Sequence, residues 1–137
     1  MKHARIRDQF ERRIVELVTL HFDAPPSANA LFANNPRTGG RMRTRVYEAW
    51  RQSAATEIMT QRPGRIVGRY GIGIEVRRAS LRRDLDNALK GISDILVEMG
   101  IVEDDRFAEH IEMCWTDDEA VTGVNVRVWQ EKPARAA

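Results

Sequence analysis

The sequence has one cysteine, Cys114, in 137 residues. A lone cysteine excludes an intrachain disulfide and a zinc site made of several thiolates, and it fits a reducing compartment. Long apolar runs are also missing, because the most apolar stretches, such as Ile14 to Phe22, are short and interrupted. Such a stretch cannot span a bilayer, and the amino terminus has no continuous apolar core of the signal-peptide type. We therefore expect a cytoplasmic protein.

Histidine is scarce as well. The chain has His3, His21 and His110, and their spacing is not that of metal ligands. Hydrophobic residues, by contrast, make up 42% of the chain, which is enough to build one core in a protein of this length. The sequence therefore predicts a charged N-terminal arm at residues 1–13, one domain at residues 14–131 and a flexible tail at residues 132–137.

The net charge is only +2, but the charges are unevenly distributed along the chain. Residues 1–83 hold 17 Lys or Arg against 7 Asp or Glu, whereas residues 84–119 hold 2 against 12. The first block can hold a polyanion, and the second concentrates oxygen ligands that would repel DNA unless cations lay between them. This pairing indicates a metal-dependent nuclease. The alternative is that both blocks are ordinary solvated surface.

Hydrophobic periodicity divides the domain into strands and helices. Alternating or β-branched runs predict strands at residues 14–22, 69–77, 107–115 and 121–129, the second of them with one buried face. Apolar residues three and four apart predict two helices: residues 44–61, with Val46, Tyr47, Trp50, Ala54 and Ile58 on one stripe, and residues 84–99, ending at Gly100.

Residues 27–43 are rich in Asn, Gly, Pro and Arg, which predicts a long loop of functional importance. The order of the elements predicts a single-domain α+β fold, with a mixed or antiparallel sheet packed against two main helices. The order of strands within the sheet does not follow from the sequence.

Acidic residues gather at the start of the second predicted helix and again after Gly100, in Glu103-Asp104-Asp105. Taken singly, they have ordinary roles: Asp84 can cap the helix, and Asp86 can form an exposed ion pair with Lys90 four residues later. Taken together, clustered carboxylates repel one another unless a cation neutralises them. The cluster therefore favours a cation site.

Asp84, Asp86 and Asp105 can provide oxygen ligands for Mg²⁺ if the chain after Gly100 folds back toward the amino end of the helix. Such a site suits phosphodiester hydrolysis, because a metal ion generates a nucleophilic water and neutralises charge on the phosphate. Lys90 could contact the phosphate, and Asn87 could orient a water or a metal ligand.

Two motifs of the chain also resemble those of a known family. Asp84-Leu85-Asp86-Asn87 with Lys90, then Asp94 and Asp104-Asp105, resembles the signature of the RusA family of Holliday-junction resolvases. Pro25-Pro26-Ser27-Ala28-Asn29 resembles that family's Pro-Pro-Ser-x-Asn after the first strand, and the likeness spans about residues 14–129.

This resemblance implies a RusA-like endonuclease domain at residues 14–131 and the activity of a crossover junction endodeoxyribonuclease. Such an enzyme acts on branched DNA in recombination and repair, in association with the nucleoid. By position, it implies Mg²⁺-site acids at Asp84, Asp86 and Asp105, with Asp104 beside them, and a catalytic lysine at Lys90. It also implies a homodimer, because paired nicks in opposed strands need two equivalent sites.

Arginine and asparagine residues around these motifs are candidates for phosphate contacts, which fix the position of DNA without reading its sequence. The candidates are Arg77, Arg78, Arg82 and Arg83, which precede the acids, and Asn29, Arg37, Arg41 and Arg43 in the loop. For Arg77 and Arg78, a solvated strand end is an almost equal alternative.

Two other functions fit the same sequence. One is a catalytically silent module that binds junction DNA through the same fold. The other is a Mg²⁺-dependent nucleotide-processing enzyme, which is disfavoured because the chain lacks a Gly-rich phosphate loop.

Overall fold

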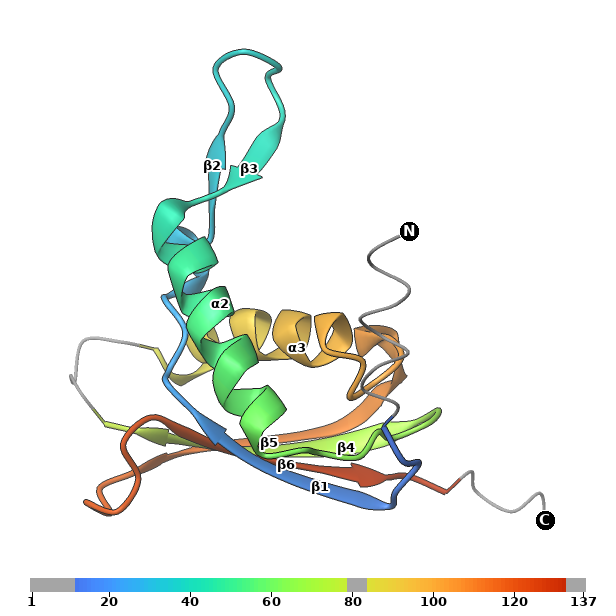
Figure 1. Cartoon of the computed structure of the whole chain (residues 1–137). Coiled ribbons are helices and arrows are strands. Elements are labelled where there is room, and N and C mark those ends of the chain that lie inside the picture. Colours follow the sequence, from blue (N-terminus) through green and yellow to red (C-terminus); the bar gives the residue numbers. More distant parts are fainter. Residues whose placement is uncertain (1–11, 79–83, 133–137) are drawn as a thin grey trace.

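The computed structural model describes residues 12–78 and 84–132. In Figure 1, a four-stranded sheet lies beneath two long helices, and a narrow β-hairpin extends away from this body. The arrangement is a single small α+β domain with a mixed sheet, which confirms the predicted fold class. The described residues do not include Arg82, Arg83 or nearly all of the predicted N-terminal arm (residues 1–13) and C-terminal tail (residues 132–137).

The sheet has the strand order β1-β6-β4-β5. Its strands are β1 (Leu17–Phe22), β4 (Tyr70–Arg77), β5 (Ala108–Thr116) and β6 (Val124–Gln130). β6 pairs antiparallel with both β1 and β4, whereas β5 pairs parallel with β4. Because β5 is parallel to β4, the chain must return from the end of β4 to its start before β5 begins.

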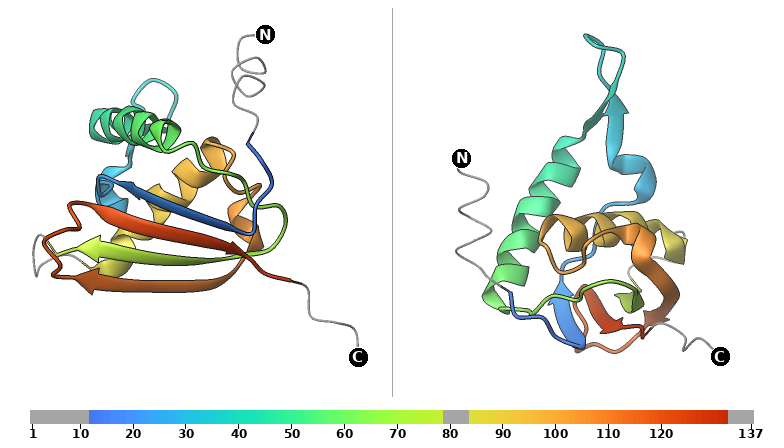
Figure 2. Two further views of the ribbon diagram at one scale, coloured as in Figure 1. Left: turned by 60° about the horizontal axis from the view of Figure 1, so that its bottom comes forward. Right: turned by 90° about the vertical axis from the view of Figure 1, so that its right-hand side faces the viewer.

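Helices α2 (Arg45–Thr60) and α3 (Leu89–Glu98) pack on one face of the sheet, as the two views of Figure 2 show. Every second residue of β1 is buried beneath them, and α3 contributes Ile92, Ile95 and Leu96 to the same core. This alternation reflects the period of two that places successive strand side chains on opposite faces.

The predicted stripe of α2 is largely correct, since Tyr47, Trp50, Ala54 and Ile58 are buried. The prediction was wrong for Val46, because its side chain is 61% exposed. Thr44 caps the start of the helix: its Oγ1 accepts a hydrogen bond from the Tyr47 amide (3.1 Å) and donates one to the Ala30 carbonyl (2.6 Å). This cap fixes the base of the preceding hairpin to the body.

Strand β4 is buried on both faces, whereas the sequence predicted one buried face. On the face away from the helices, the Trp129 ring of β6 lies directly over Gly71, and a Cβ at this position would collide with it. The glycines looked like solvent-facing positions in the alternating pattern, but they accommodate a neighbouring aromatic ring.

The segment predicted as a loop at residues 27–43 contains a β-hairpin. Its strands, β2 (Phe32–Asn34) and β3 (Arg41–Arg43), pair antiparallel and follow a short 3-10 helix, η1 (Ala28–Ala30). Its turn includes Gly39 at φ 72°, a conformation that favours glycine. The prediction that this segment is an irregular loop was therefore wrong. Strands of three residues are too short to show a periodic pattern in the sequence. From here on, the arm means residues 31–44, which are distinct from the charged N-terminal segment at residues 1–13.

The segment predicted as one helix at residues 84–99 is divided. It starts as a 3-10 turn, η2 (Leu85–Ala88), and continues as α3, which ends just before Gly100 at φ 72°. Gly100 therefore ends the helix as predicted. Within the described residues, no helix is long and apolar enough to cross a membrane.

Candidate active site at the start of helix α3

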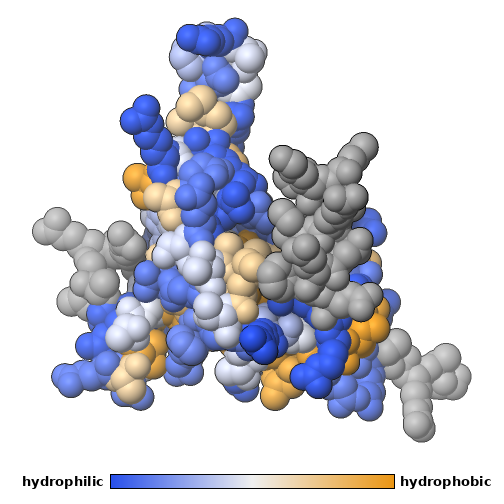
Figure 3. All heavy atoms as spheres, in the orientation of Figure 1, coloured by the Kyte–Doolittle hydropathy of each residue, from blue (hydrophilic) through white to orange (hydrophobic). Residues whose placement is uncertain are grey.

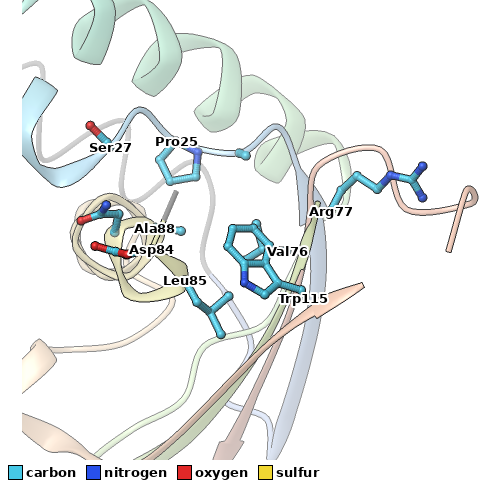
Figure 4. Close-up of a pocket in the computed structure, with 10 residues that line it drawn as sticks. Pro25, Ser27, Val76, Arg77, Asp84, Leu85, Ala88 and Trp115 are labelled. Carbon is cyan, nitrogen blue, oxygen red and sulfur yellow. The ribbon is translucent and has the colours of Figure 1, made fainter. Parts of the chain in front are cut away.

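The two sequence motifs meet at the amino end of α3. Pro25 and Ser27 from the segment after β1 lie beside Asp84 and Asn87 from the segment before α3, although almost 60 residues separate them. Together they line a hollow of about 50 Å³, drawn in Figure 4. The tertiary structure thus brings the two motifs together around this hollow.

The walls of the hollow come from the ends of two strands. Val76 and Arg77 stand at the end of β4, and Trp115 stands near the end of β5. Ligands bind frequently at the carboxyl ends of parallel strands, because the chain there leaves the sheet in loops whose side chains can converge. The hollow therefore occupies a typical position for a binding site.

Gly91 allows this arrangement, because α3 packs tightly against the segment after β1. A Cβ on Gly91 would lie 2.8 Å from the Pro25 Cβ, closer than real contacts permit, and 3.4 Å from its Cγ. A proline ring cannot rotate out of the way. The absence of a side chain at residue 91 thus sets the distance between the two motifs.

We expect Gly91→Ala to destabilise the protein by about 1–3 kcal/mol, as overpacking of a core does. Helix propensity alone gives the opposite sign, because alanine is favoured over glycine in a helix interior by about 1 kcal/mol. Urea unfolding measures the difference, with Ser93→Ala on the same helix as the control. A Gly91→Ala protein more stable than wild type would contradict the close packing.

Asp84 and Asp86 are both exposed, and Asp84 lines the hollow. Asp84 occupies the N-cap position of η2, but its side chain makes no capping hydrogen bond. Neither carboxylate takes part in an ion pair within the described part of the chain. The two structural roles considered for them, a helix cap by Asp84 and an ion pair between Asp86 and Lys90, are therefore not observed. Asn87, which also lines the hollow, is half-buried.

Lys90 forms an ion pair with Asp94, with Nζ 3.1 Å from Oδ1, rather than with Asp86. The other oxygen of Asp94 accepts a hydrogen bond from the hydroxyl of Tyr47 on α2 (3.2 Å). Burial, followed by the charge of Asp94, raises the pKa of Tyr47 to about 12, so the hydroxyl remains a donor at neutral pH. Asp94 thus holds Lys90 in place one turn beyond Asp86.

The connection between Lys90, Asp94 and Tyr47 continues to the arm. The guanidinium of Arg43 lies over the Tyr47 ring, 5.4 Å from its centroid, and pairs with Glu48 (3.1 Å) and Glu98 (3.7 Å). Asp94 belongs to the motif that resembles the family signature, but its sequence position gave it no expected role. The four-residue spacing to Lys90 was an available signal for the ion pair, whereas nothing in the sequence pointed to Tyr47.

Asp104 and Asp105 lie at the other end of α3. Asp105 begins the 3-10 turn η3 (Asp105–Phe107), which Asp104 caps by accepting a hydrogen bond from the Arg106 amide (3.0 Å). Both acids are near Tyr70 at the start of β4, where burial and their charges raise its pKa to about 12. Since β4 runs about 23 Å from Tyr70 to Arg77 at 3.3 Å per residue, they are distant from Asp84 and Asp86.

The predicted Mg²⁺ ligands are therefore divided within one chain. Asp84 and Asp86 are together at one end of α3, and Asp104 and Asp105 are together at the other. Across residues 12–78 and 84–132, no group of three or more His, Cys, Asp or Glu side chains could hold a metal ion. Aspartate carboxylates are suitable ligands for Mg²⁺. Within a single chain, however, the four predicted aspartates are too far apart to bind one ion together.

The predicted DNA-binding residues occupy two regions. Asn29, Arg37, Arg41 and Arg43 lie in η1 and the arm, all with exposed side chains. Arg77 and Arg78 lie at the end of β4, where both are anchored to Asp117: Arg77 donates to its carbonyl (2.8 Å), and Arg78 pairs with its carboxylate (3.3 Å). Both side chains are thus held in part by contacts within the chain.

No protein-family model matches this chain, and no curated protein matches its sequence. The likeness to the RusA family therefore depends on the motifs themselves, which the fold brings together only in part.

Proposed function

We propose that this protein is a divalent-metal-dependent endodeoxyribonuclease that acts on four-way DNA junctions as a homodimer. The main support is the meeting of the Pro25–Ser27 segment with the Asp84–Asn87 segment around one hollow, next to the exposed Lys90. Two carboxylates with no ion-pair partner in the described residues and a positioned ammonium group suit a phosphodiester substrate held by a hard cation. Mg²⁺ is the ion that we propose.

The arm supports a nucleic-acid substrate independently of the acids. It extends from the body in Figure 1, and its surface is mostly hydrophilic in Figure 3. Residues 24–47 contain four arginines and no acid. Arg41 lies over the Phe32 ring (5.3 Å from its centroid), and this contact holds the guanidinium against the hairpin. A projecting, basic hairpin can follow a DNA backbone that the body does not reach.

The proposal is tested by incubating the purified protein with a four-way junction whose strands carry separate labels. We expect symmetrically placed nicks in two opposed strands, dependent on Mg²⁺ and abolished by a chelator. A linear duplex with the same sequence should remain intact. Failure to nick any junction with Mg²⁺ or Mn²⁺, despite binding, would contradict the nuclease proposal.

The Arg37→Ala/Arg41→Ala variant should bind junction DNA about tenfold more weakly or worse, whatever the sequence, because phosphate contacts carry no sequence information. Losing two phosphate contacts should also lower the slope of log K against log salt by about 2. Fluorescence anisotropy at several salt concentrations measures both quantities. The matched control is Arg127→Ala, an exposed arginine of β6 on the sheet face away from the helices. Equal losses in both proteins would exclude a specific role for the arm.

A catalytically silent junction-binding module is the second candidate. The separation of Asp84 and Asp86 from Asp105 favours it, because one chain alone does not assemble the three acids. Such a protein would shift a four-way junction in a gel and leave all strands intact with every divalent ion. The nicking experiment therefore decides between the two functions.

A further inference from the structure

Tyr47 of α2 lies between the arm and the start of α3. Its hydroxyl donates a hydrogen bond to Asp94 (3.2 Å), and the other oxygen of Asp94 pairs with the ammonium group of Lys90 (3.1 Å). Its ring faces the arm: the guanidinium of Arg43 lies 5.4 Å from the ring centroid, and the ring of Phe32 meets it edge-on, with 5.6 Å between centroids. One side chain of α2 therefore contacts both regions.

The ring of Tyr47 is held from several sides. The residue is 1% exposed, and its ring stacks on that of Trp50, with 6.0 Å between the centroids and 20° between the planes. Trp50 is fixed in turn, because its Nε1 donates a hydrogen bond to the Asp23 carbonyl (2.8 Å). Stacked, edge-on and cation contacts each favour one placement of an aromatic ring. The hydroxyl of Tyr47 is therefore a donor with a fixed position.

The ammonium group of Lys90 depends on such support. Its side chain is 53% exposed, and an exposed ion pair between residues four apart on a helix is weak, because both side chains must give up rotational freedom. The side chain of Asp94, by contrast, is only 23% exposed and is bound by the Tyr47 hydroxyl. An acid that is already fixed lowers the cost of ordering the lysine.

We propose that Tyr47 is a positioning residue that links the arm to Lys90: the arm holds its ring, and its hydroxyl fixes Lys90 through Asp94. The effect on nicking rests on the proposed function, whereas the ordering of Lys90 does not. Since Arg43 is also a candidate phosphate contact, DNA on the arm and the ammonium group of Lys90 are coupled through this ring. Tyr47 itself touches neither the hollow's acids nor the proposed phosphate.

The hydroxyl's part is tested by NMR, which requires no activity. The chain has three lysines, so 15N-labelled lysine gives few ammonium signals, and Lys90→Arg identifies that of Lys90. In Tyr47→Phe, which keeps the ring, the order parameter of this group should fall to that of Lys132, an exposed lysine after β6. The matched control is Tyr70→Phe, at an equally buried tyrosine. A Lys90 group as mobile in wild type as in Tyr47→Phe, or an equal fall in Tyr70→Phe, would overturn the proposal.

The arm's part is tested with two arginine variants in the same NMR experiment. Arg43→Ala removes the guanidinium over the Tyr47 ring, so the order parameter of Lys90 should fall to a value between those of wild type and Tyr47→Phe. Arg41→Ala removes the same charge from the same arm, but Arg41 lies over Phe32 instead, and Lys90 should stay as ordered as in wild type. Equal order parameters in the two variants would overturn the link between the arm and Lys90.

The effect on nicking is tested by measuring rate and affinity separately. At saturating protein, Tyr47→Phe should nick the four-way junction about threefold to tenfold more slowly, because a displaced reacting group is costly. Its affinity for the junction should stay within about twofold of wild type, since the hydroxyl is proposed to act on the rate alone. Tyr47→Phe/Asp94→Asn should nick no more slowly than Asp94→Asn, because the hydroxyl acts through that carboxylate.

An unchanged rate in Tyr47→Phe, or losses that multiply in the double variant, would overturn the role of Tyr47 in nicking. If the wild type nicks no junction with any divalent ion, the proposed function fails. The order parameters of Lys90 then decide by themselves whether Tyr47 links this lysine to the arm.

Discussion

The Asp86→Asn variant is expected to lose junction nicking by a factor of about 100–1,000, as enzymes do when one preorganised electrostatic group is removed. Asparagine has nearly the same shape but no charge, so it is a much poorer ligand for a hard cation. Asp86 is exposed and makes no ion pair in the described part of the chain. We therefore expect the free energy of unfolding to change by no more than about 0.5 kcal/mol.

Binding should respond in the opposite direction from nicking. Removing a negative charge near the proposed phosphate position lowers the repulsion of DNA, so the affinity in the absence of divalent ions should be unchanged or higher. Single-turnover nicking and anisotropy on the same junction separate the two effects. Asp118→Asn, an exposed acid after β5, controls for charge. Undiminished nicking by Asp86→Asn would remove Asp86 from the proposed site.

The Lys90→Ala variant is expected to lose about 100-fold in nicking rate, because it removes a charge proposed to act on the phosphate as negative charge develops there. Asp94→Asn should have a smaller effect of about tenfold, since it leaves the ammonium group present but releases it from its 3.1 Å ion pair. Asp94 is thus a positioning residue, and the hydroxyl of Tyr47 holds it from the other side.

A double-mutant cycle distinguishes positioning from a merely structural role. If Asp94 acts through Lys90, the Lys90→Ala/Asp94→Asn protein should nick as slowly as Lys90→Ala alone. Losses that multiply would show that the two residues act independently. Thermal unfolding of all three variants serves as the control, because Asp94 is half-buried and its replacement could act through stability.

The sequence by itself determined the main elements of the fold. The spacing of Tyr47, Trp50, Ala54 and Ile58 predicted helix α2, because a helix must bury one side and its period reveals which. Alternation predicted the long strands, and Gly100 marked the end of α3. The candidate site residues were also found from sequence: the clustering of acids pointed to a cation, and the resemblance of two motifs to a known family gave each residue its expected role.

Only the tertiary structure decided what depends on contacts between distant segments. The hairpin of the arm has strands of three residues, too short for a periodic signal, and the double burial of β4 depends on the Trp129 ring from another strand. The distance from Asp84 to Asp105 follows from the parallel pairing of β4 with β5, which sends α3 back along the full strand. Local sequence patterns determine which side chains share a face, but strand order and direction determine which ends of the elements meet.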